Sequence, residues 1–422
     1  MHRVSDAPVE IPVHRYTDPE YFAREQAHLW PRVWQLACPI DQVAKPGDFY
    51  EYRCGTLSIV VVRDLDGELR GFQNACRHRG SAICEGSGCG LTELRCPFHR
   101  WTWSLDGRLR EIPSRKQYAV ANDDVSLIPV AVDTWGPLVF VNCDLDAEPL
   151  REFLDPVPSE CEWAALDEFR CSAMVSIPAE CNWKTLIDGF SETYHVQGIH
   201  REMLGMADDV NGPQVVWRRA GRLVQSYGLA SPRIAGRNDV DDQFVWEHFV
   251  RVMGARVGAD MNDPGPCPPI GDRETLRDVL ARMVVEHQRA TRSVDLSCYD
   301  TEQLLDMQQY NIFPNITVLV FADMLQIVRA RPGATTTDSF MDAMSFERHP
   351  RGTDTPRAKP FELDLDPNAE LPLGLVLNQD VANFARAQRG LHQPGLRHII
   401  VSPDEECRIV NLHRNLEEFV GD

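Results

Sequence analysis

The sequence lacks any run of about 18 consecutive apolar residues, the length that a membrane-spanning helix needs. Its first 34 residues carry five acidic side chains and no basic start followed by an apolar core, so we expect no signal peptide. Positive charge is scarce, because 43 Lys and Arg stand against 63 Asp and Glu and give a formal net charge of -20. Such a chain is a poor partner for phosphate backbones. We therefore predict a cytoplasmic protein with no membrane and no nucleic-acid partner.

A dinucleotide-binding loop is also missing. The glycine-rich stretch 86–90 does not have the Gly-x-Gly-x-x-Gly spacing, so we expect any nicotinamide or flavin cofactor on a partner protein. With 43% hydrophobic and 25% charged residues over 422 positions, the composition is that of a globular chain of two or three domains. Thirteen cysteines in a reducing compartment predict metal ligands and free thiols, such as Cys84 and Cys89, and no disulfide framework.

The apolar pattern of residues 1–38 predicts an amphipathic helix over positions 16–36. Asp18 is placed to cap this helix, and Pro19 suits its first turn. We expect this N-terminal segment to pack on a part of the chain that follows later, within residues 151–422.

From 39 to 150 short strand-like runs dominate, and Asp66-Gly67 and Asp106-Gly107 separate some of them. Asp-Gly between strand-like runs is a strong hairpin signal, so this part predicts an all-β domain of small antiparallel sheets. Residues 151–422 mix both patterns, which makes the fold class α+β. Helices are expected at 155–166, 182–195, 273–292 and 374–391, and strands at 214–228 and 316–347.

Two short motifs in the β domain each combine a thiolate and an imidazole. They are Cys76 with His78 and Cys96 with His99, separated by 17 residues. A zinc finger places both cysteines on one element and both histidines on another, so the alternating order disfavours structural zinc. A Rieske [2Fe–2S] cluster needs two cysteines on one iron and two histidines on the other. The pattern therefore predicts a Rieske cluster, with a zinc site or four unrelated side chains as the alternatives.

The region around these motifs is basic, with six arginines against three acidic residues between positions 76 and 110. Arg77, Arg79 and Arg100 lie next to the predicted cluster ligands. On an acidic chain they are candidates for docking an acidic electron carrier, because complementary charge raises the rate of encounter. The alternative is that they only brace the loops.

A second possible metal site begins at residue 182. Asp188, Glu192 and His195 are spaced to share one face of a helix. His200 would lie about 140° away from His195 on an ideal helix, so both imidazoles reach one metal only if the helix distorts. Gly198 permits such a break. We predict a distorted helix with two converging histidines.

Two histidines leave room for a carboxylate ligand from elsewhere in the chain. The best candidate is Asp380, near the start of the predicted helix at 374–391, and the competing candidates are Asp188 and Asp342. Two histidines and one carboxylate on one face of an iron leave open positions for O2.

Bulky apolar residues after the histidines are candidates for a substrate pocket and favour a hydrophobic substrate. They are Phe244, Trp246, Phe313, Phe321 and Leu325.

With both constellations in place, the chain resembles the Rieske non-heme iron oxygenases, in particular the α subunit of the ring-hydroxylating group. The resemblance covers most of the chain. It is carried by the segment 16–34, the two Cys/His motifs, and the stretches at 101–107, 135–142, 182–200, 311–315 and 380–390.

The resemblance implies a Rieske domain over residues 39–150 and a catalytic domain over 151–422 with a helix-grip fold, in which a curved antiparallel sheet surrounds a long helix. It implies Asp380 as the carboxylate ligand and a homotrimer, with or without a β subunit. In such trimers the residue three before the first iron histidine, here Glu192, bridges to a cluster histidine of the neighbour, here His99. Most relatives carry Asp at that position, and relatives that act on quaternary ammonium compounds carry Glu. Glu192 and Asp188 are our candidates for electron transfer.

The expected function is that of the terminal component of an oxidoreductase system. A ferredoxin or flavin reductase would pass electrons from NAD(P)H to the Rieske cluster, and Fe(II) would activate O2 to hydroxylate a hydrophobic, aromatic or polycyclic substrate, as in aromatic hydrocarbon catabolism. One alternative is oxidative demethylation or C–N cleavage of a quaternary ammonium, N-methyl or O-methyl compound. A second is a Rieske electron carrier without oxygenase activity, and a third is a zinc-stabilised binding protein.

Overall fold

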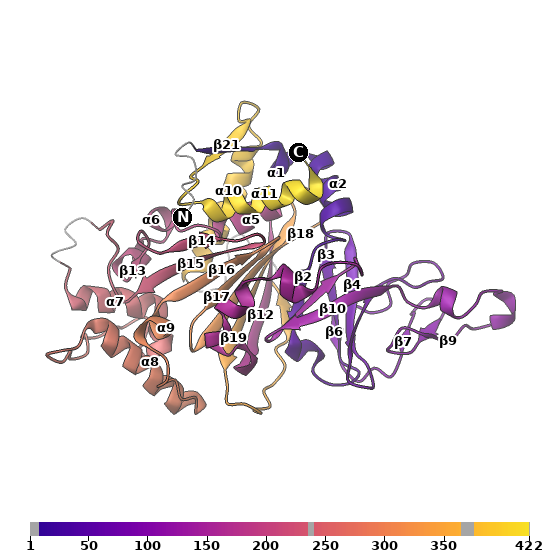
Figure 1. Cartoon of the computed structure of the whole chain (residues 1–422), viewed down its shortest axis with the longest axis horizontal. Helices are drawn as coiled ribbons and strands as arrows, with labels where there is room; N and C mark the ends of the chain where they lie inside the picture. The colour runs from indigo at the N-terminus through magenta and orange to yellow at the C-terminus, as the bar shows by residue number, and fades with distance from the viewer. Residues whose placement is uncertain (1–7, 235–239, 364–374, 422) are drawn as a thin grey trace.

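A seven-stranded sheet and a nine-stranded sheet lie side by side and account for most of the molecule (Figure 1). The computed structural model describes residues 8–234, 240–363 and 375–421. Within these ranges a three-stranded sheet extends the seven-stranded one outward, and a two-stranded sheet pairs β1 (Val9–Pro12) with β21 (His398–Val401).

Residues 35–142 form the predicted β domain. Its seven-stranded sheet has the order β2 (Gln35–Pro39), β11 (Leu138–Asn142), β10 (Pro129–Trp135), β5 (Leu69–Gln73), β4 (Leu57–Arg63), β3 (Phe49–Cys54) and β6 (Ser87–Gly88). The three-stranded sheet consists of β7 (Leu94–Arg95), β8 (Thr102–Trp103) and β9 (Leu109–Glu111). Both expected Asp-Gly hairpins are confirmed: Gly67 (φ +89°) joins β4 to β5, and Gly107 (φ +85°) joins β8 to β9. Glycine adopts these positive φ values without a steric cost.

The C-terminal half contains the predicted antiparallel sheet. Its strand order is β13 (Ala207–Asp208), β15 (Ala220–Tyr227), β16 (Met307–Ile312), β17 (Ile316–Val320), β18 (Met324–Pro332), β19 (Ser339–Arg348), β12 (Phe169–Ala179) and β20 (Pro360–Glu362), and β14 (Gln214–Val216) also pairs with β15. All neighbours are antiparallel except β12 and β20.

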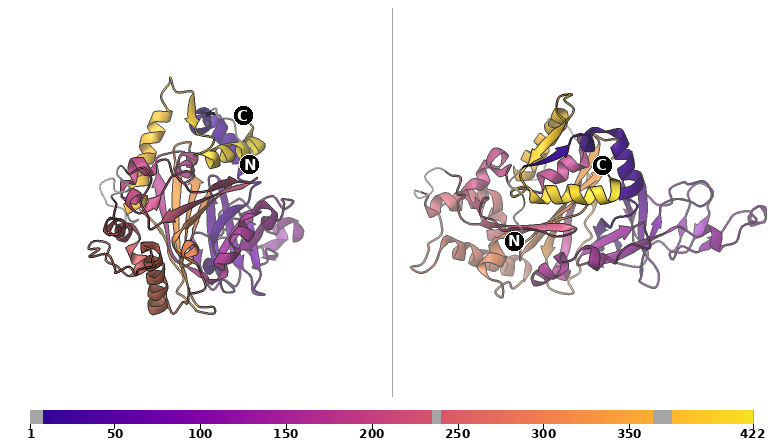
Figure 2. Two further views of the ribbon diagram at one scale, coloured as in Figure 1. Left: turned by 60° about the vertical axis from the view of Figure 1, so that its left-hand side comes forward. Right: turned by 45° about the horizontal axis from the view of Figure 1, so that its top comes forward.

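Helices cover this second sheet in two groups (Figure 2). One group lies in space around the two chain termini and consists of α1 (His14–Thr17), α2 (Pro19–Arg24), α5 (Trp183–Gly189), α10 (Leu375–Leu391) and α11 (Cys407–Val420). The other group is α7 (Asp242–Met253), α8 (Leu276–Arg292) and α9 (Thr301–Leu305). Among the described helices, none is both long and apolar enough to cross a membrane.

The short remaining helices are single turns. They are α3 (Leu150–Phe153), α4 (Val157–Glu160), α6 (Val196–Ile199) and the 3-10 turns Ile40–Val43, Arg115–Gln117, Asp123–Val125, Glu162–Ala164, Leu166–Glu168, Arg201–Gly205 and Gly254–Val257.

Three predicted helices are shorter than expected. The N-terminal helix is capped by Asp18 as predicted, but it continues as a π-helical turn that ends at Leu29. The stretch 155–166 forms only short turns, because α4 ends at Glu160 and Ala165 adopts a left-handed conformation (φ +45°) through which a helix does not continue. The helix expected at 182–195 ends at Gly189, because the Phe190 carbonyl accepts from the Asn311 side chain (2.7 Å) instead of continuing the helical ladder. Glu192 and His195 therefore do not share a helix face with Asp188.

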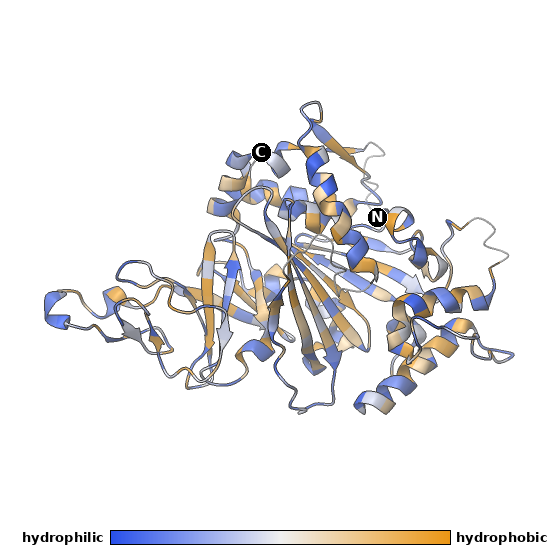
Figure 3. Cartoon of the chain, turned by 180° about the vertical axis from the view of Figure 1, so that it is seen from behind, coloured by the Kyte–Doolittle hydropathy of each residue, from blue (hydrophilic) through white to orange (hydrophobic). Residues whose placement is uncertain are grey.

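One continuous buried cluster joins the two large sheets, and the colouring by hydropathy shows many hydrophobic residues along their strands (Figure 3). The N-terminal segment contributes Trp30, whose ring meets Trp183 of α5 edge-on with centroids 5.1 Å apart. The buried Lys184 of α5 places its Nζ 2.5 Å from Glu25 Oε1. The segment before β2 thus holds the helix that leads to the histidines.

Candidate metal centres

Two loops of the β domain bring the Cys/His motifs together. Cys76 and His78 follow β5, while Cys96 and His99 lie between β7 and β8. Both sulfurs are buried, and the rings of His78 and His99 lie edge to face with centroids 4.7 Å apart. The Trp101 ring stacks flat on His78 at 5.1 Å, which fixes the plane of that imidazole.

The donor atoms of these loops fit a Rieske cluster. Backbone N–H groups of Phe98 and His99 outweigh burial and bring the pKa of the Cys96 thiol below the ordinary value, whereas burial and the adjacent Cys96 raise the pKa of Cys76. The N–H groups around Cys96 favour its thiolate form, which is the form that binds a metal. Among the described residues, buried His78 Nδ1 has no hydrogen-bond partner. A buried nitrogen without a partner is costly, and a metal ion bound at Nδ1 would satisfy it.

The basic residues around the loops serve partly as braces. Arg79 Nη2 lies 3.0 Å from His99 Nε2, and its guanidinium covers the Phe98 ring at 4.7 Å. Arg77 donates to the Asp124 carbonyl (2.9 Å). Both arginines and Arg100 remain exposed, and Phe98 beside them is 63% exposed. The arginines can therefore stabilise the cluster loops and still contact a partner protein.

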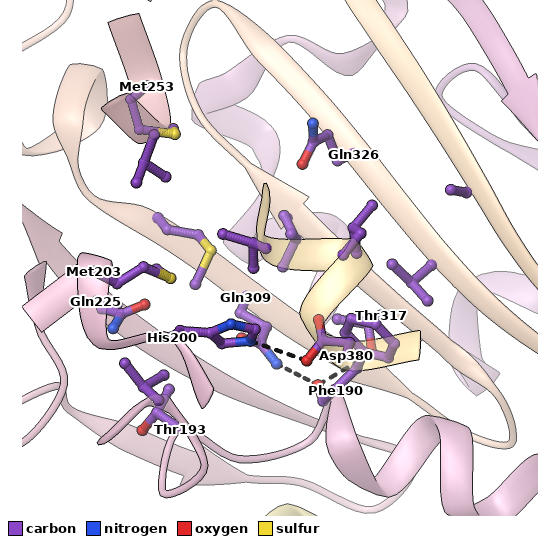
Figure 4. Close-up of a pocket in the computed structure, with 18 of the residues that line it drawn as sticks. Phe190, Thr193, His200, Met203, Gln225, Met253, Gln309, Thr317, Gln326 and Asp380 are labelled. Atoms are coloured by element: carbon purple, nitrogen blue, oxygen red, sulfur yellow. Dashed lines mark hydrogen bonds and ion pairs between the residues drawn. The ribbon is translucent and has the colours of Figure 1, made fainter. Parts of the chain in front are cut away.

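A second donor set forms where α10 approaches the segment 190–200. His195, His200 and Asp380 each offer one ligand atom, and these atoms lie within 4.8 Å of one another. Asp380 Oδ1 is 2.9 Å from His200 Nε2 and 3.9 Å from His195 Nε2. Figure 4 shows His200 and Asp380 meeting at one wall of a cavity. Two imidazoles and one carboxylate with free space on the other side fit an iron with open positions.

The outer nitrogens of both histidines are held in place. His195 Nδ1 lies 2.6 Å from Glu192 Oε1, and His200 Nδ1 lies 2.7 Å from Gln379 Oε1. Each acceptor keeps the proton on Nδ1, which leaves Nε2 as the metal-binding nitrogen. Burial lowers the pKa of His195, but the Glu192 and Asp380 carboxylates outweigh burial and raise it above the usual value.

The two competing carboxylates lie elsewhere. Asp342 pairs with Arg329 (2.8 Å) and Arg331 (2.5 Å), on the side of the sheet that faces β3. Asp188 accepts from Tyr16 Oη at 2.6 Å, and burial raises its pKa to about 7. Neither carboxylate lines the cavity beside the histidines.

That cavity has a volume of about 250 Å³. Its lining is mostly apolar and unusually rich in methionine, with glutamine amides of three strands among the polar groups (Figure 4). The charged lining groups besides the histidines are Glu192, Asp380 and, at the exposed end of α7, Arg251. The six methionines are Met203, Met253, Met261, Met307, Met324 and Met344.

Of the five predicted pocket residues, Phe321 lines this cavity and the other four do not. Phe244 and Trp246 turn into the helical core around α7, where Trp246 Nε1 donates to the Pro264 carbonyl (3.0 Å). Leu325 points to the opposite face of β18 from Met324, because side chains alternate along a strand.

Phe313, the last of the four, lies just beyond the end of β16 and stacks on Phe419 of α11 with ring centroids 5.6 Å apart.

Among the residues of the site that were not predicted from the sequence are Gln379 and the cavity-lining Phe190, Gln225, Tyr227 and Gln309. Gln225 and Tyr227 are two residues apart on β15, so both side chains lie on the same face of the strand, and both are buried. A buried glutamine at an inward strand position is unusual, because an amide must find partners there. The alternation along this strand could have indicated that Gln225 and Tyr227 face the interior, whereas nothing in the sequence marks Gln379.

The fold is that of the Rieske oxygenases. The chain is similar to the quaternary ammonium Rieske monooxygenase CntA in complex with L-carnitine, with a TM-score of 0.68 and 16% identity over 98% of this chain and 96% of that one. It is also similar to naphthalene 1,2-dioxygenase from Rhodococcus sp., with a TM-score of 0.65 and 19% identity over 98% of this chain and 94% of that one.

Residues 33–132 match the Rieske [2Fe-2S] domain family, and residues 166–422 match the ring hydroxylating alpha subunit (catalytic domain) family. The second match covers more than half of the chain. The protein therefore belongs to the ring-hydroxylating alpha subunit family, and a Rieske cluster and a mononuclear iron are its implied cofactors.

Curated relatives include the glycine betaine monooxygenase oxygenase subunit of Pseudomonas aeruginosa (strain UCBPP-PA14), 28% identical over 51% of this chain and 51% of that protein. The carnitine monooxygenase oxygenase subunit of Escherichia coli (strain K12) is 29% identical over 53% of this chain and 59% of that protein. The chain thus spans between half and three fifths of the length of these two relatives.

Proposed function

We propose that the chain is the oxygenase component of a Rieske-type, O2-dependent oxidoreductase system. The observation that carries the proposal is the convergence of His195, His200 and Asp380 on a mostly apolar cavity in a chain that also presents two Cys/His loops. In this proposal Cys76, His78, Cys96 and His99 hold the [2Fe–2S] cluster, and the other three residues hold Fe(II).

When bound, the cluster would supply electrons one at a time, and the iron would offer open positions for O2. The protein's own part is to orient and to shield. Glu192 and Gln379 keep the Nδ1 protons in place so that both Nε2 atoms face the metal. The apolar lining keeps bulk water from the reacting groups, and the glutamine amides give a substrate points of orientation.

Electron delivery in this proposal comes from a neighbouring subunit of a homotrimer. The cluster loops, near β7 and β9, lie at the opposite end of the molecule from the elements around the cavity, such as α6 and α7 (Figure 1). Glu192 already accepts from the N–H and Nδ1 of His195 (2.9 and 2.6 Å). A carboxylate has about four acceptor positions, so Glu192 retains capacity for His99 of the neighbour. In this proposal Asp188, which accepts from Tyr16 Oη (2.6 Å), holds the end of α5 that precedes Glu192.

The substrate we propose is a small quaternary ammonium or N-methyl compound, oxidised at a methyl or C–N carbon. The names of the glycine betaine and carnitine relatives favour this alternative over the aromatic or polycyclic substrate expected from the sequence, and aromatic hydrocarbon catabolism is not supported. The lining is compatible with a cation, because Glu192 supplies charge and the faces of Phe190, Tyr227 and Phe321 can attract an ammonium group.

The decisive experiment is a product screen with a surrogate flavin reductase or ferredoxin and NADH. Glycine betaine, carnitine, choline and a panel of arenes are offered in parallel, and products are identified by mass. Loss of a methyl group or C–N cleavage in an ammonium compound is the expected result. Arene products gaining one or two oxygens would overturn the substrate proposal, and absence of any O2-dependent product with intact iron would favour an electron carrier.

A further inference from the structure

A small internal cavity behind the metal-binding segment is lined by cations and amides but by no carboxylate. It lies between α11 and the sheet, and its volume of about 20 Å³ is enough for one occupant the size of a water molecule. Its charged lining residues are Arg219 and Arg408, and its polar lining residues are Ser191 and three asparagines.

Arg408 is the unusual member of this lining. Its side chain is 2% exposed, and its Nε donates to the Ser191 carbonyl at 2.8 Å. Among the described residues, no group accepts a hydrogen bond from its Nη1 or Nη2. Burial lowers the pKa of Arg408 to about 10, so the guanidinium is still charged at neutral pH.

No neighbouring carboxylate is hydrogen-bonded to this guanidinium within the described part of the chain. Arg219 has its own partner, because its Nη2 lies 2.8 Å from Glu418, and among the described residues its Nε has no acceptor. The Glu192 carboxylate attracts Arg408 through space, but its hydrogen bonds go to the N–H and Nδ1 of His195 and not to the guanidinium. Arg408 also sits in the first turn of α11, where the helix dipole is positive and disfavours a second cation.

An unpaired buried cation costs several kcal/mol, so such groups are normally found with a counter-charge. We propose that this cavity is a binding site for one monatomic anion of the chloride class, held by Arg408 Nη1 and Nη2 and by Arg219 Nε. The size of the cavity excludes carboxylates and phosphate. By neutralising Arg408, the anion would secure the bond to Ser191 and therefore the segment that begins with Glu192. This inference does not depend on the oxygenase reaction.

Crystals of the full chain in bromide test the site directly. An anomalous bromine peak at the Arg408 guanidinium is expected. Density for a water molecule without any bromine signal in that cavity would overturn the proposal.

Solution measurements add an independent readout. The Tm is followed while sodium gluconate is replaced by sodium chloride or bromide at constant ionic strength. Halide should raise Tm in proportion to the logarithm of its concentration in the parent chain, because a ligand of the native state stabilises it. The rise should disappear in Arg408→Met and persist in Arg414→Met, which removes an exposed arginine of the same helix. A rise that Arg408→Met retains would contradict the site; if that variant does not fold, the bromide crystals decide.

Discussion

We expect the buried ion pair between Lys184 and Glu25 to contribute most of the free energy that holds the N-terminal segment on α5. Both side chains are 0% exposed, Nζ lies 2.5 Å from Oε1, and Trp183 Nε1 donates to Oε2 at 3.1 Å. Lys184→Met leaves the carboxylate buried with only the indole donor. Removing one partner of a buried pair costs about 3–5 kcal/mol, so we expect a loss of that size in the free energy of unfolding at neutral pH.

The pair can be separated from other effects by a double-mutant cycle in urea, followed by tryptophan fluorescence. Glu25→Gln keeps an acceptor for Trp183, so Lys184→Met combined with Glu25→Gln should recover most of the loss. The loss should also shrink at acidic pH, because burial already raises the pKa of Glu25 and a proton can replace the missing lysine. Lys45→Met, at an exposed position, should change stability by less than about 0.5 kcal/mol. A loss below about 1 kcal/mol in Lys184→Met, or no recovery in the double variant, would refute this reasoning.

Three further predictions concern Gln379, Arg251 and the buried Asp188. Gln379→Leu removes the acceptor of His200 Nδ1 and should weaken Fe(II) binding about 10–100-fold by dialysis and iron assay, whereas Gln379→Glu should retain it. Arg251→Met should raise KM about tenfold for ammonium substrates that carry a carboxylate, because a charged hydrogen bond contributes about 1.5 kcal/mol or more. The KM for choline, which has no carboxylate, should not change. Equal effects on both kinds of substrate would contradict a contact between Arg251 and the substrate carboxylate. Asp188 has a folded pKa of about 7 against 3.8 for the free group, so the folded state holds a proton that the unfolded state releases. The stabilisation that protonated Asp188 gives the folded state is therefore lost as pH rises, by about 1.6 kcal/mol between pH 5.5 and 7. Urea unfolding of Asp188→Asn should lack this pH dependence.

The local patterns predicted the fold well where short-range chemistry decides it. Asp66-Gly67 sets its hairpin through backbone conformation alone, and the antiparallel sheet follows from alternation along strands such as β15. The helix expected at 182–195 is shorter for a long-range reason, because the side chain of Asn311, 121 residues away, donates a hydrogen bond to the Phe190 carbonyl.

The site shows the same division. The spacing of His195 and His200 suggested a metal pair, and the structure brings Asp380 to them from α10. Gln379 could not be anticipated, since its role depends on how α10 meets His200. The pocket prediction placed Phe244 and Trp246 in the cavity because they are bulky and apolar, but residues of that kind also fill ordinary cores, as they do around α7.

The central claim is that the chain holds two separate iron centres, and metal analysis of Asp380→Ala tests it most directly. The parent chain should contain about three irons and two acid-labile sulfides, and the variant about two irons and two sulfides with an unchanged Rieske EPR signal. A variant that keeps all of its iron, or one that loses the sulfide and the Rieske signal together with the third iron, would contradict the account.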